Sequence, residues 1–341
     1  MSKYLSQKKQ EGKKTFLEIH HDWIHLLWNN FFQSQSCFQL QKKLDDLIRN
    51  LDELSKEIAT RVLYTHIIML HTEGIFSLTN FQFSDSANTP DFFPLDKEER
   101  KKTNAMKKTF RNKYIFTDAT NKQNVSTELD SFFLNQYDLN YFTPDVQKII
   151  DNKDVIDGGG LIGDTAMIFA ELPVKKVYVF EPNPDTFRIL EKNISLNSQV
   201  LGENIQKITP VSLALGKSCG STTLYSNGSC DGGTSVHSRK SAKEYDVSVT
   251  SIDDYVQKNS LNVGLIKLDV EGEESNVIEG AIETIKTQKP LLIISIYHTP
   301  KDFFEIKLRL ESLNIGYKFM IRQTTSECPT YYEICLLGYP E

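Results

Sequence analysis

The chain has 341 residues and a formal net charge of −6, with 39 basic and 45 acidic residues. This length is enough for two domains, or for one domain with a large extension. The acidic balance argues against a nucleic-acid partner, because such a partner usually requires a basic protein face. The first residues contain no apolar segment of a secretory signal, and nothing approaches the roughly 18 continuous apolar residues of a membrane span. We therefore expect a cytoplasmic protein whose five cysteines are reduced thiols.

Residues 1–140 are expected to form a helical N-terminal region followed by a linker. Apolar residues recur there with alternating spacings of four and three, at Leu40, Leu44, Leu47, Leu51, Leu54 and Ile58. This spacing is typical of a coiled-coil seam. Two alternatives remain open: a homodimer contact through these helices, or an amphipathic helix packed on the protein's own core. Prolines and a charge run between about residues 80 and 145 indicate a linker or surface segment.

From residue 141 onward, strands and helices alternate, which predicts an α/β domain over 141–341 with a mostly parallel sheet. Five strands are expected, ending at Asp157, Glu181, Leu215, Leu268 and Ile296, the third of them covering Ile208–Leu215. One helix is expected to carry the apolar residues from Val277 to Ile285 on a single face. A polar stretch, 217–245, interrupts the alternation. Two last segments, Tyr317–Ile321 and Tyr332–Leu337, predict an antiparallel hairpin.

A glycine-rich turn follows the first strand, in the run VIDGGGLIGDTA from Val155 to Ala166. The strand ends at Asp157, and a helix is expected to begin at Asp164-Thr165. Glycine is needed where the backbone approaches a ligand, because a Cβ would strike the ligand or force a costly positive φ. A strand, a glycine loop and a helix in this order are typical of a site for a nucleotide-like ligand.

The second strand, in VYVFEPNP, ends in an acid, Glu181. A carboxylate at this place can accept both hydroxyl hydrogens of a ribose. The next helix is expected to have Asn183 as its N-cap and Pro184 at its first position, where proline is favoured. The complete strand–helix–strand unit favours a binding loop over a plain tight turn.

Four polar residues stand at the ends of expected strands: Asp157, Glu181, Asp269 and His298. Parallel α/β sheets bind ligands at the carboxyl ends of their strands. We therefore expect these side chains, which come from four separate segments, to converge on one rim of the sheet.

The terminal hairpin after five strand–helix units resembles the Rossmann-like fold of class I S-adenosylmethionine-dependent methyltransferases. Residues 145–341 resemble the FkbM-type family within that class, in VIDGGGLIGDTA, VYVFEPNPDTFRILEKNISLN, SLALG, LIKLDVEGEESNVIEGA and PLLIISIYHTPKDFFEI. The most specific part is the Asp-x-Glu-Gly-x-Glu signature at Asp269, Glu271, Gly272 and Glu274. The resemblance implies S-adenosylmethionine (SAM) as the cofactor.

The resemblance also carries cofactor-binding positions onto this chain. Glu181 matches the family's ribose-binding acid, and Gly160 stands where many members have alanine. A carboxylate such as Asp157 suits the ammonium group of the cofactor, and backbone N–H groups at a helix N-terminus suit its carboxylate. The expected cofactor-binding residues are Asp157, Gly158, Gly159, Gly160, Gly163, Asp164, Glu181, Asn183, Ser212, Leu213, Ala214 and Asp269.

Methyl transfer requires a nucleophile held about 3 Å from the methyl carbon, and a hydroxyl nucleophile benefits from a nearby base. His298 is the first candidate for this base, because the ordinary pKa of imidazole is near neutrality. The alternative is a structural histidine. Asp269 is expected to orient His298 or to contact the substrate hydroxyl. Glu271 and Glu274 are expected to contact a polyol; the alternative is that Glu271 and Glu273 favour a helix N-terminus through their charge. No metal site is expected.

The expected function is transfer of a methyl group from SAM to a hydroxyl of a sugar, glycan or sugar nucleotide, as in polysaccharide biosynthesis. This follows from the resemblance, since the family is associated with O-methylation of sugars and secondary metabolites. Two other classes remain open. An NAD(P)-dependent sugar-modifying oxidoreductase would use the same glycine loop, but no Tyr-x-x-x-Lys is well placed after the fourth strand. A non-catalytic interaction protein would use the leucine seam as its interface.

Overall fold

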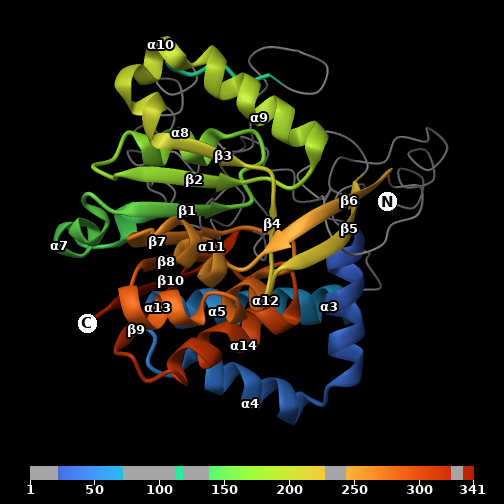
Figure 1. Ribbon diagram of the computed structural model, residues 1–341. Helices are drawn as coiled ribbons and strands as arrows, with labels where there is room; N and C mark the ends of the chain where they lie inside the picture. Colours follow the sequence, from blue (N-terminus) through green and yellow to red (C-terminus); the bar gives the residue numbers. More distant parts are fainter. Residues whose placement is uncertain (1–21, 72–112, 118–137, 227–242, 324–332) are drawn as a thin grey trace, which may run out of the picture.

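The structure is a computed structural model that describes residues 22–71, 113–117, 138–226, 243–323 and 333–341. Its centre is a seven-stranded sheet with the order β3-β2-β1-β7-β8-β10-β9 (Figure 1). All neighbouring strands are parallel except at β10, which is antiparallel to both β8 and β9. The strands are β1 (Asp154–Gly158), β2 (Lys176–Phe180), β3 (Ile208–Val211), β7 (Val263–Leu268), β8 (Leu291–Ser295), β9 (Tyr317–Gln323) and β10 (Ile334–Pro340). The predicted parallel sheet with a terminal antiparallel hairpin is confirmed.

Helices cover both faces of this sheet, because consecutive strand side chains point to opposite faces. Ile156 and Ile266 belong to one core cluster, whereas their neighbours Val155 and Leu265 belong to the other. The first cluster includes residues of α3 (Asp22–Ser34), α4 (Cys37–Ile48), α5 (Glu53–His71), α11 (Ile252–Asn259), α12 (Glu274–Glu279), α13 (Ile282–Gln288) and α14 (Pro300–Glu311). The second includes residues of η3 (Leu139–Tyr141), α7 (Pro144–Gln147), η4 (Lys148–Ile150), α8 (Asp164–Ala170), α9 (Pro184–Leu196), α10 (Ser198–Leu201) and η5 (Gly202–Lys207).

A second, three-stranded sheet with the order β4-β6-β5 lies beside the carboxyl end of β2 (Figure 1). It consists of β4 (Ala214–Leu215), β5 (Gly220–Ser226) and β6 (Lys243–Thr250). The prediction of a single strand over Ile208–Leu215 is therefore wrong. The chain leaves the main sheet after Val211, and Ala214 and Leu215 pair with Val249 and Thr250 of β6 instead.

The single helix predicted across Val277–Ile285 is also wrong, because it is divided into α12 and α13. A Cβ at Gly280 would lie 2.3 Å from the carbonyl oxygen of Gly216, so the two backbones touch at this break. The carboxylate of Asp253 accepts hydrogen bonds from the N–H groups of Glu283 and Thr284 and thereby starts α13. The break thus follows from tertiary contacts that the apolar spacing does not reveal.

The leucines of the N-terminal region do not form one continuous seam. Helix α4 ends at Ile48, Asn50 has a positive φ of 62°, and α5 begins at Glu53. Of the six seam positions, Leu54 is 50% exposed and the other five are buried in a cluster shared with the sheet. The structure thus uses these residues in the protein's own core. The homodimer and the domain boundary at residue 140 stay predictions.

Other expectations concern individual segments. Within the described residues no helix combines the length and the apolarity needed to cross a membrane. Three cysteines, Cys37, Cys219 and Cys335, are free thiols. The part of the polar stretch between residues 227 and 242, and most of the expected linker, lie outside the described residues.

Candidate active site

A cavity of about 570 Å³ lies at the carboxyl ends of β1, β2 and β7. It is lined by several predicted site residues: Gly159, Asp164, Glu181, Leu213, Ala214, Asp269 and Glu271. Its further walls include Leu161, Pro182, Lys217, Ser218, Lys267, Glu273 and Asn276. The other predicted residues, Asp157, Gly158, Gly160, Gly163, Asn183, Ser212 and His298, are not among the lining residues. The rim therefore converges as expected, but only part of the predicted set faces the cavity.

The glycine loop after β1 is held tightly against its protein neighbours. Gly159 has a φ of +83°, and a Cβ there would lie 1.8 Å from the carbonyl oxygen of Asp269. A Cβ at Gly160 would lie 2.2 Å from a methyl carbon of Val179. The N–H groups of both glycines donate to the carbonyl of Phe180, at 3.1 and 2.9 Å. Gly159 is thus required by backbone packing in addition to any ligand approach, whereas a side chain at Gly160 would have to displace the side chain of Val179.

Asp157 is fully buried behind the loop, where it contacts two side chains. Its Oδ2 accepts a hydrogen bond of 2.6 Å from the hydroxyl of Thr165, and its Oδ1 lies 3.2 Å from Nζ of Lys267. Lys267 is 1% exposed and also donates to the carbonyls of Gly158 and Gly159, at 3.2 and 2.9 Å. Burial opposes the charge of Lys267, but the nearby carboxylates, that of Asp157 foremost, raise its pKa above the ordinary value.

Asp164, at the first position of α8, lines the cavity although it is only 3% exposed. Burial raises its pKa to about 7, while the backbone N–H of Thr165 and the charge of Lys267 act in the opposite direction. Among the described residues of the glycine loop and α8, Asp164 is therefore the carboxyl that can meet a cationic ligand group in the cavity.

Glu181 follows β2 directly and is 6% exposed. Its two carboxylate oxygens accept hydrogen bonds from the N–H groups of Leu161 and Asn183, at 3.1 and 2.9 Å. The carboxylate is thereby fixed between the glycine loop and the start of α9, facing the cavity. Asn183 is the N-cap of α9, as predicted, and its side chain accepts from the N–H groups of Asp185 and Thr186. The cofactor-binding role of Asn183 stays a prediction.

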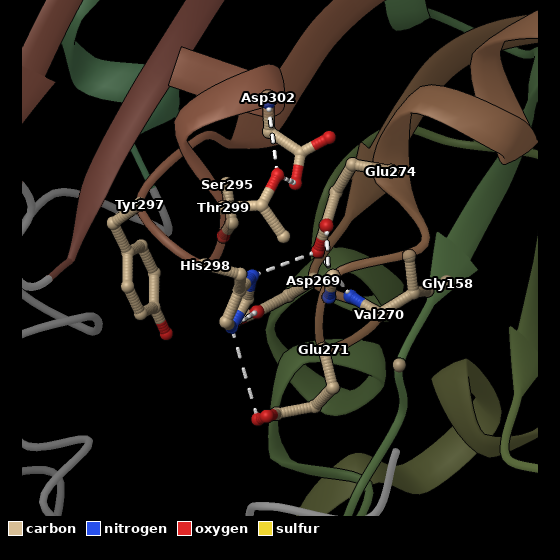
Figure 2. A network of polar contacts seen from close by, with 12 residues as sticks. Gly158, Asp269, Val270, Glu271, Glu274, Ser295, Tyr297, His298, Thr299 and Asp302 are labelled. Carbon is tan, nitrogen blue, oxygen red and sulfur yellow. Dashed lines mark hydrogen bonds and ion pairs between the residues drawn. The ribbon is translucent and has the colours of Figure 1, made fainter. Parts of the chain in front are cut away.

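His298 follows β8 and is surrounded by three carboxylates (Figure 2). Its Nδ1 lies 2.9 Å from Oε1 of Glu274, and its Nε2 lies 3.5 Å from Oδ1 of Asp269 and 3.8 Å from Oε1 of Glu271. His298 and Glu274 are fully buried, whereas the side chains of Asp269 and Glu271 are 21% and 15% exposed and line the cavity. The ring of Tyr297 packs 4.1 Å from the imidazole ring. His298 thus reaches the cavity through Asp269 and Glu271.

His298 and Glu274 each stabilise the charged form of the other. Burial opposes the imidazolium form of His298, but Glu274, Glu271 and Asp269 together raise its pKa well above the ordinary value. Burial likewise opposes ionisation of Glu274, but His298 and the backbone hydrogen bonds lower its pKa. Burial and the charge of Glu274 raise the pKa of nearby Asp302 to about 7. The resting protein therefore holds a buried imidazolium–carboxylate pair.

One group among the described residues has the spacing of metal ligands: Asp269, Glu274 and His298 each offer an atom within 4.8 Å of the others. The two oxygens of Glu274, however, already accept from the N–H groups of Val270 and Gly272. His298 Nδ1 lies 2.9 Å from one of these same oxygens. We therefore assign the group to a hydrogen-bonded network instead of a metal centre.

Lys267 and Glu274 are the residues whose roles the sequence analysis missed. Lys267 is the charged residue in the strand VGLIKL, in which every residue is buried. A buried lysine needs a carboxylate partner, so a lysine within this apolar strand could have indicated a buried ion pair. Glu274 was expected to contact a polyol, but its side chain is fully buried and does not line the cavity. It contacts His298 instead, and this contact joins elements that are far apart in the sequence.

The sheet order, the antiparallel β10 and the cavity beside the glycine loop define a class I methyltransferase domain. Residues 157–319 match the family model described as the methyltransferase FkbM domain. The match lies within the predicted domain over 141–341.

The chain also resembles individual known proteins. Methyltransferase 1 of Beauveria bassiana (strain ARSEF 2860) is 28% identical over 185 residues, which cover 49% of this chain and 74% of that protein. The crystal structure of methyltransferase FkbM from Methylobacillus flagellatus KT is 21% identical with a TM-score of 0.43, over 55% of this chain and 44% of that chain. An rRNA methylase from Streptococcus thermophilus is 14% identical with a TM-score of 0.34, over 57% and 92% of the two chains. This chain therefore spans less than half of the M. flagellatus protein.

Proposed function

We propose that the protein transfers the methyl group of SAM to a hydroxyl of a sugar, glycan or sugar nucleotide. The observation that carries the proposal is the set of residues that line the cavity at the carboxyl ends of β1, β2 and β7. It joins Glu181, which we propose binds the ribose, to the carboxylates of Asp269 and Glu271, which contact His298. A nucleoside cofactor bound there would lie in the same space as the proposed proton-accepting group.

The described residues fit SAM in size and in chemistry. A volume of about 570 Å³ lies in the usual range of small-molecule sites. Glu181 can accept the ribose hydroxyl hydrogens, Asp164 can pair with the ammonium, and Leu213 and Ala214 offer an apolar wall to the adenine. When bound, SAM supplies a methyl carbon that is activated by the sulfonium charge.

The residues of the rim perform the remaining steps. Asp269 and Glu271 hold the acceptor hydroxyl and align its oxygen with the methyl carbon. As the C–O bond forms and the C–S bond breaks, the hydroxyl proton would leave toward Nε2 of His298 through Asp269 or Glu271. The products are the methyl ether, S-adenosylhomocysteine and a protonated His298. His298 must therefore be neutral before turnover, and because its pKa is raised, the rate is expected to increase with pH.

A polyol acceptor is supported by polar residues among those that line the cavity. Lys217, Ser218, Glu273 and Asn276 line it together with Glu271. Such a mixture of hydrogen-bond donors and acceptors suits a hydroxylated ligand. The FkbM match supports the same class of substrate through the resemblance described above.

We further propose a cytoplasmic location for the reaction.

Calorimetric titration with SAM, S-adenosylhomocysteine and NAD tests the proposal. We expect binding of the first two at micromolar concentrations, no binding of NAD, and a loss of at least about tenfold in affinity for Glu181→Ala. A circular dichroism spectrum of the variant checks its fold, because Glu181 also holds two backbone N–H groups. Binding of NAD alone would indicate the oxidoreductase alternative. Binding of none of the three would favour the non-catalytic alternative.

A further inference from the structure

We propose that Glu274 is a positioning residue that holds His298 with Nδ1 protonated, so that Nε2 faces the cavity carboxylates as the proton-accepting atom. The proposal concerns one buried contact, between α12 and the segment after β8. The role of Nε2 as the proton acceptor rests on the proposed function. The tautomer of His298 can be tested whether or not that function is correct.

The carboxylate of Glu274 is held by three contacts. It is fully buried at the start of α12, and its Oε1 and Oε2 accept from the N–H groups of Val270 and Gly272, at 2.8 and 3.0 Å. Oε1 also lies 2.9 Å from Nδ1 of His298. Because a carboxylate can only accept hydrogen bonds, it favours the form of the imidazole in which Nδ1 carries the proton.

The same carboxylate shapes the turn that carries Glu271. Glu271 and Gly272 have φ values of 56° and 96°, and the N–H of Glu273 donates to the carbonyl of Val270 at 3.4 Å. Two successive positive φ values are the pattern of a type I′ turn, whose first central position favours asparagine, aspartate or glycine. A glutamate at this position is unusual, and here its carboxylate reaches 3.8 Å from Nε2 of His298. One carboxylate, that of Glu274, therefore holds both the backbone of the turn and the imidazole ring of His298 in position (Figure 2).

The charged groups that face His298 come from three directions. Glu274 approaches from α12, Asp269 and Glu271 from the turn between β7 and α12, and Asp302 from α14. Asp302 accepts from the hydroxyls of Ser275 and Thr299 and affects His298 only through its charge. Glu274 is thus the carboxylate nearest to Nδ1, at 2.9 Å, whereas Asp269 and Glu271 lie nearer to Nε2.

Nuclear magnetic resonance of 15N-histidine in the wild-type protein tests the tautomer without requiring activity. The signals of His298 are identified by their loss in His298→Gln. We expect Nδ1 to stay protonated over the whole titration and the shift of Nε2 to follow pH. A neutral form with the proton on Nε2 would overturn the proposal. This measurement needs only a folded wild-type protein.

Glu274→Gln then tests the role of the charge. The amide keeps an acceptor oxygen for Nδ1 but removes the negative charge, so the pKa of His298 should fall by about one to three units. The acidic limb of the pH profile of kcat/KM should move to lower pH by the same amount, while the rate on the plateau decreases. Glu283→Gln is the matched control, because Glu283 is 70% exposed on α13, and it should leave both the limb and the plateau unchanged.

Two outcomes separate this proposal from the proposed function. If the wild type binds SAM and transfers methyl groups, but Glu274→Gln moves neither the limb nor the His298 signals, Glu274 has only a structural role. If the wild type shows no transfer but its Nδ1 stays protonated and the pKa of His298 falls in Glu274→Gln, the positioning contact stands and the proposed reaction fails.

Discussion

The indole Nε1 of Trp28 donates a hydrogen bond of 3.0 Å to the backbone carbonyl of Tyr297, across 269 positions of the chain. Trp28 is 1% exposed and packs edge-on against Phe303 of α14, with ring centroids 5.6 Å apart. Since Tyr297 precedes His298, this bond ties α3 to the segment that carries the proposed base. The N-terminal helices therefore support the rim of the sheet.

Trp28→Phe should reduce turnover without weakening cofactor binding. The variant keeps an aromatic ring in the core but leaves the carbonyl of Tyr297 without its indole donor, which costs about 1–3 kcal/mol of stability. We expect kcat to fall by up to about tenfold, because the segment before His298 loses its anchor. Steady-state kinetics and calorimetry with S-adenosylhomocysteine measure the two effects. Phe38→Ser, at a side chain that is 79% exposed, is the control. An unchanged kcat at reduced stability would confine Trp28 to a structural role.

The Asp157–Lys267 pair should show strong coupling. Lys267→Met leaves the buried carboxylate of Asp157 without its partner charge, and we expect a loss of about 3–5 kcal/mol in the free energy of unfolding. In the background of Asp157→Asn, the same change should cost about 1–3 kcal/mol less. Urea denaturation of the four proteins gives the coupling energy. Additive losses would show that the ion pair, 3.2 Å long, contributes little.

Gly159→Ala should disrupt both the loop and the site. The new Cβ would meet the carbonyl oxygen of Asp269 at 1.8 Å, so either the loop or the end of β7 must move. Gly316→Ala is the matched control, because its φ of +72° is also positive but nothing lies within 4 Å of its Cβ. We expect the control to lose about 1–2 kcal/mol of stability, and Gly159→Ala to lose more, together with cofactor binding. Equal losses would mean that backbone strain alone accounts for the effect.

Cofactor affinity should depend on pH through Asp164. The pKa of its carboxyl is raised to about 7, so its negative charge develops as pH increases through that value. The ammonium of S-adenosylhomocysteine binds the ionised form better, and its affinity should therefore rise by up to about tenfold between about pH 6 and about pH 8. In Asp164→Asn the affinity should be weaker at the higher pH and nearly independent of pH. Asp145→Asn, at a side chain that is 91% exposed, should keep the wild-type dependence. A persistent pH dependence in Asp164→Asn would assign the titration to another group.

The elements that the sequence predicted correctly depend on local patterns. The strand ending at Asp157, the N-cap at Asn183 and the final hairpin are each determined by residues close together in the sequence. The convergence of Glu181 and Asp269 on one cavity could also be predicted, because the carboxyl ends of parallel strands share one edge.

The errors have tertiary causes. Gly280 ends α12 because the backbone of Gly216 touches it, and no periodicity within the helix contains that information. The leucine spacing is compatible with a coiled coil, but the turn at Asn50 folds α4 and α5 back against the sheet. His298 was expected at the rim, yet its full burial behind Asp269 and Glu271 depends on packing between β8 and α12.

The position of β10 constrains the order in which the protein can fold during synthesis. The ribosome makes β9 before β10, yet β10 lies between β8 and β9 and pairs with both. Until residue 340 has emerged, β8 has an unpaired edge, and such an edge invites aggregation. The N–H of Ile296, two residues before His298, donates to the carbonyl of Ile334 at 2.8 Å. A nascent chain that ends with the FkbM match at residue 319 would therefore lack the strand that anchors the proposed base, and chaperone protection of the β8 edge is expected to matter most in that interval.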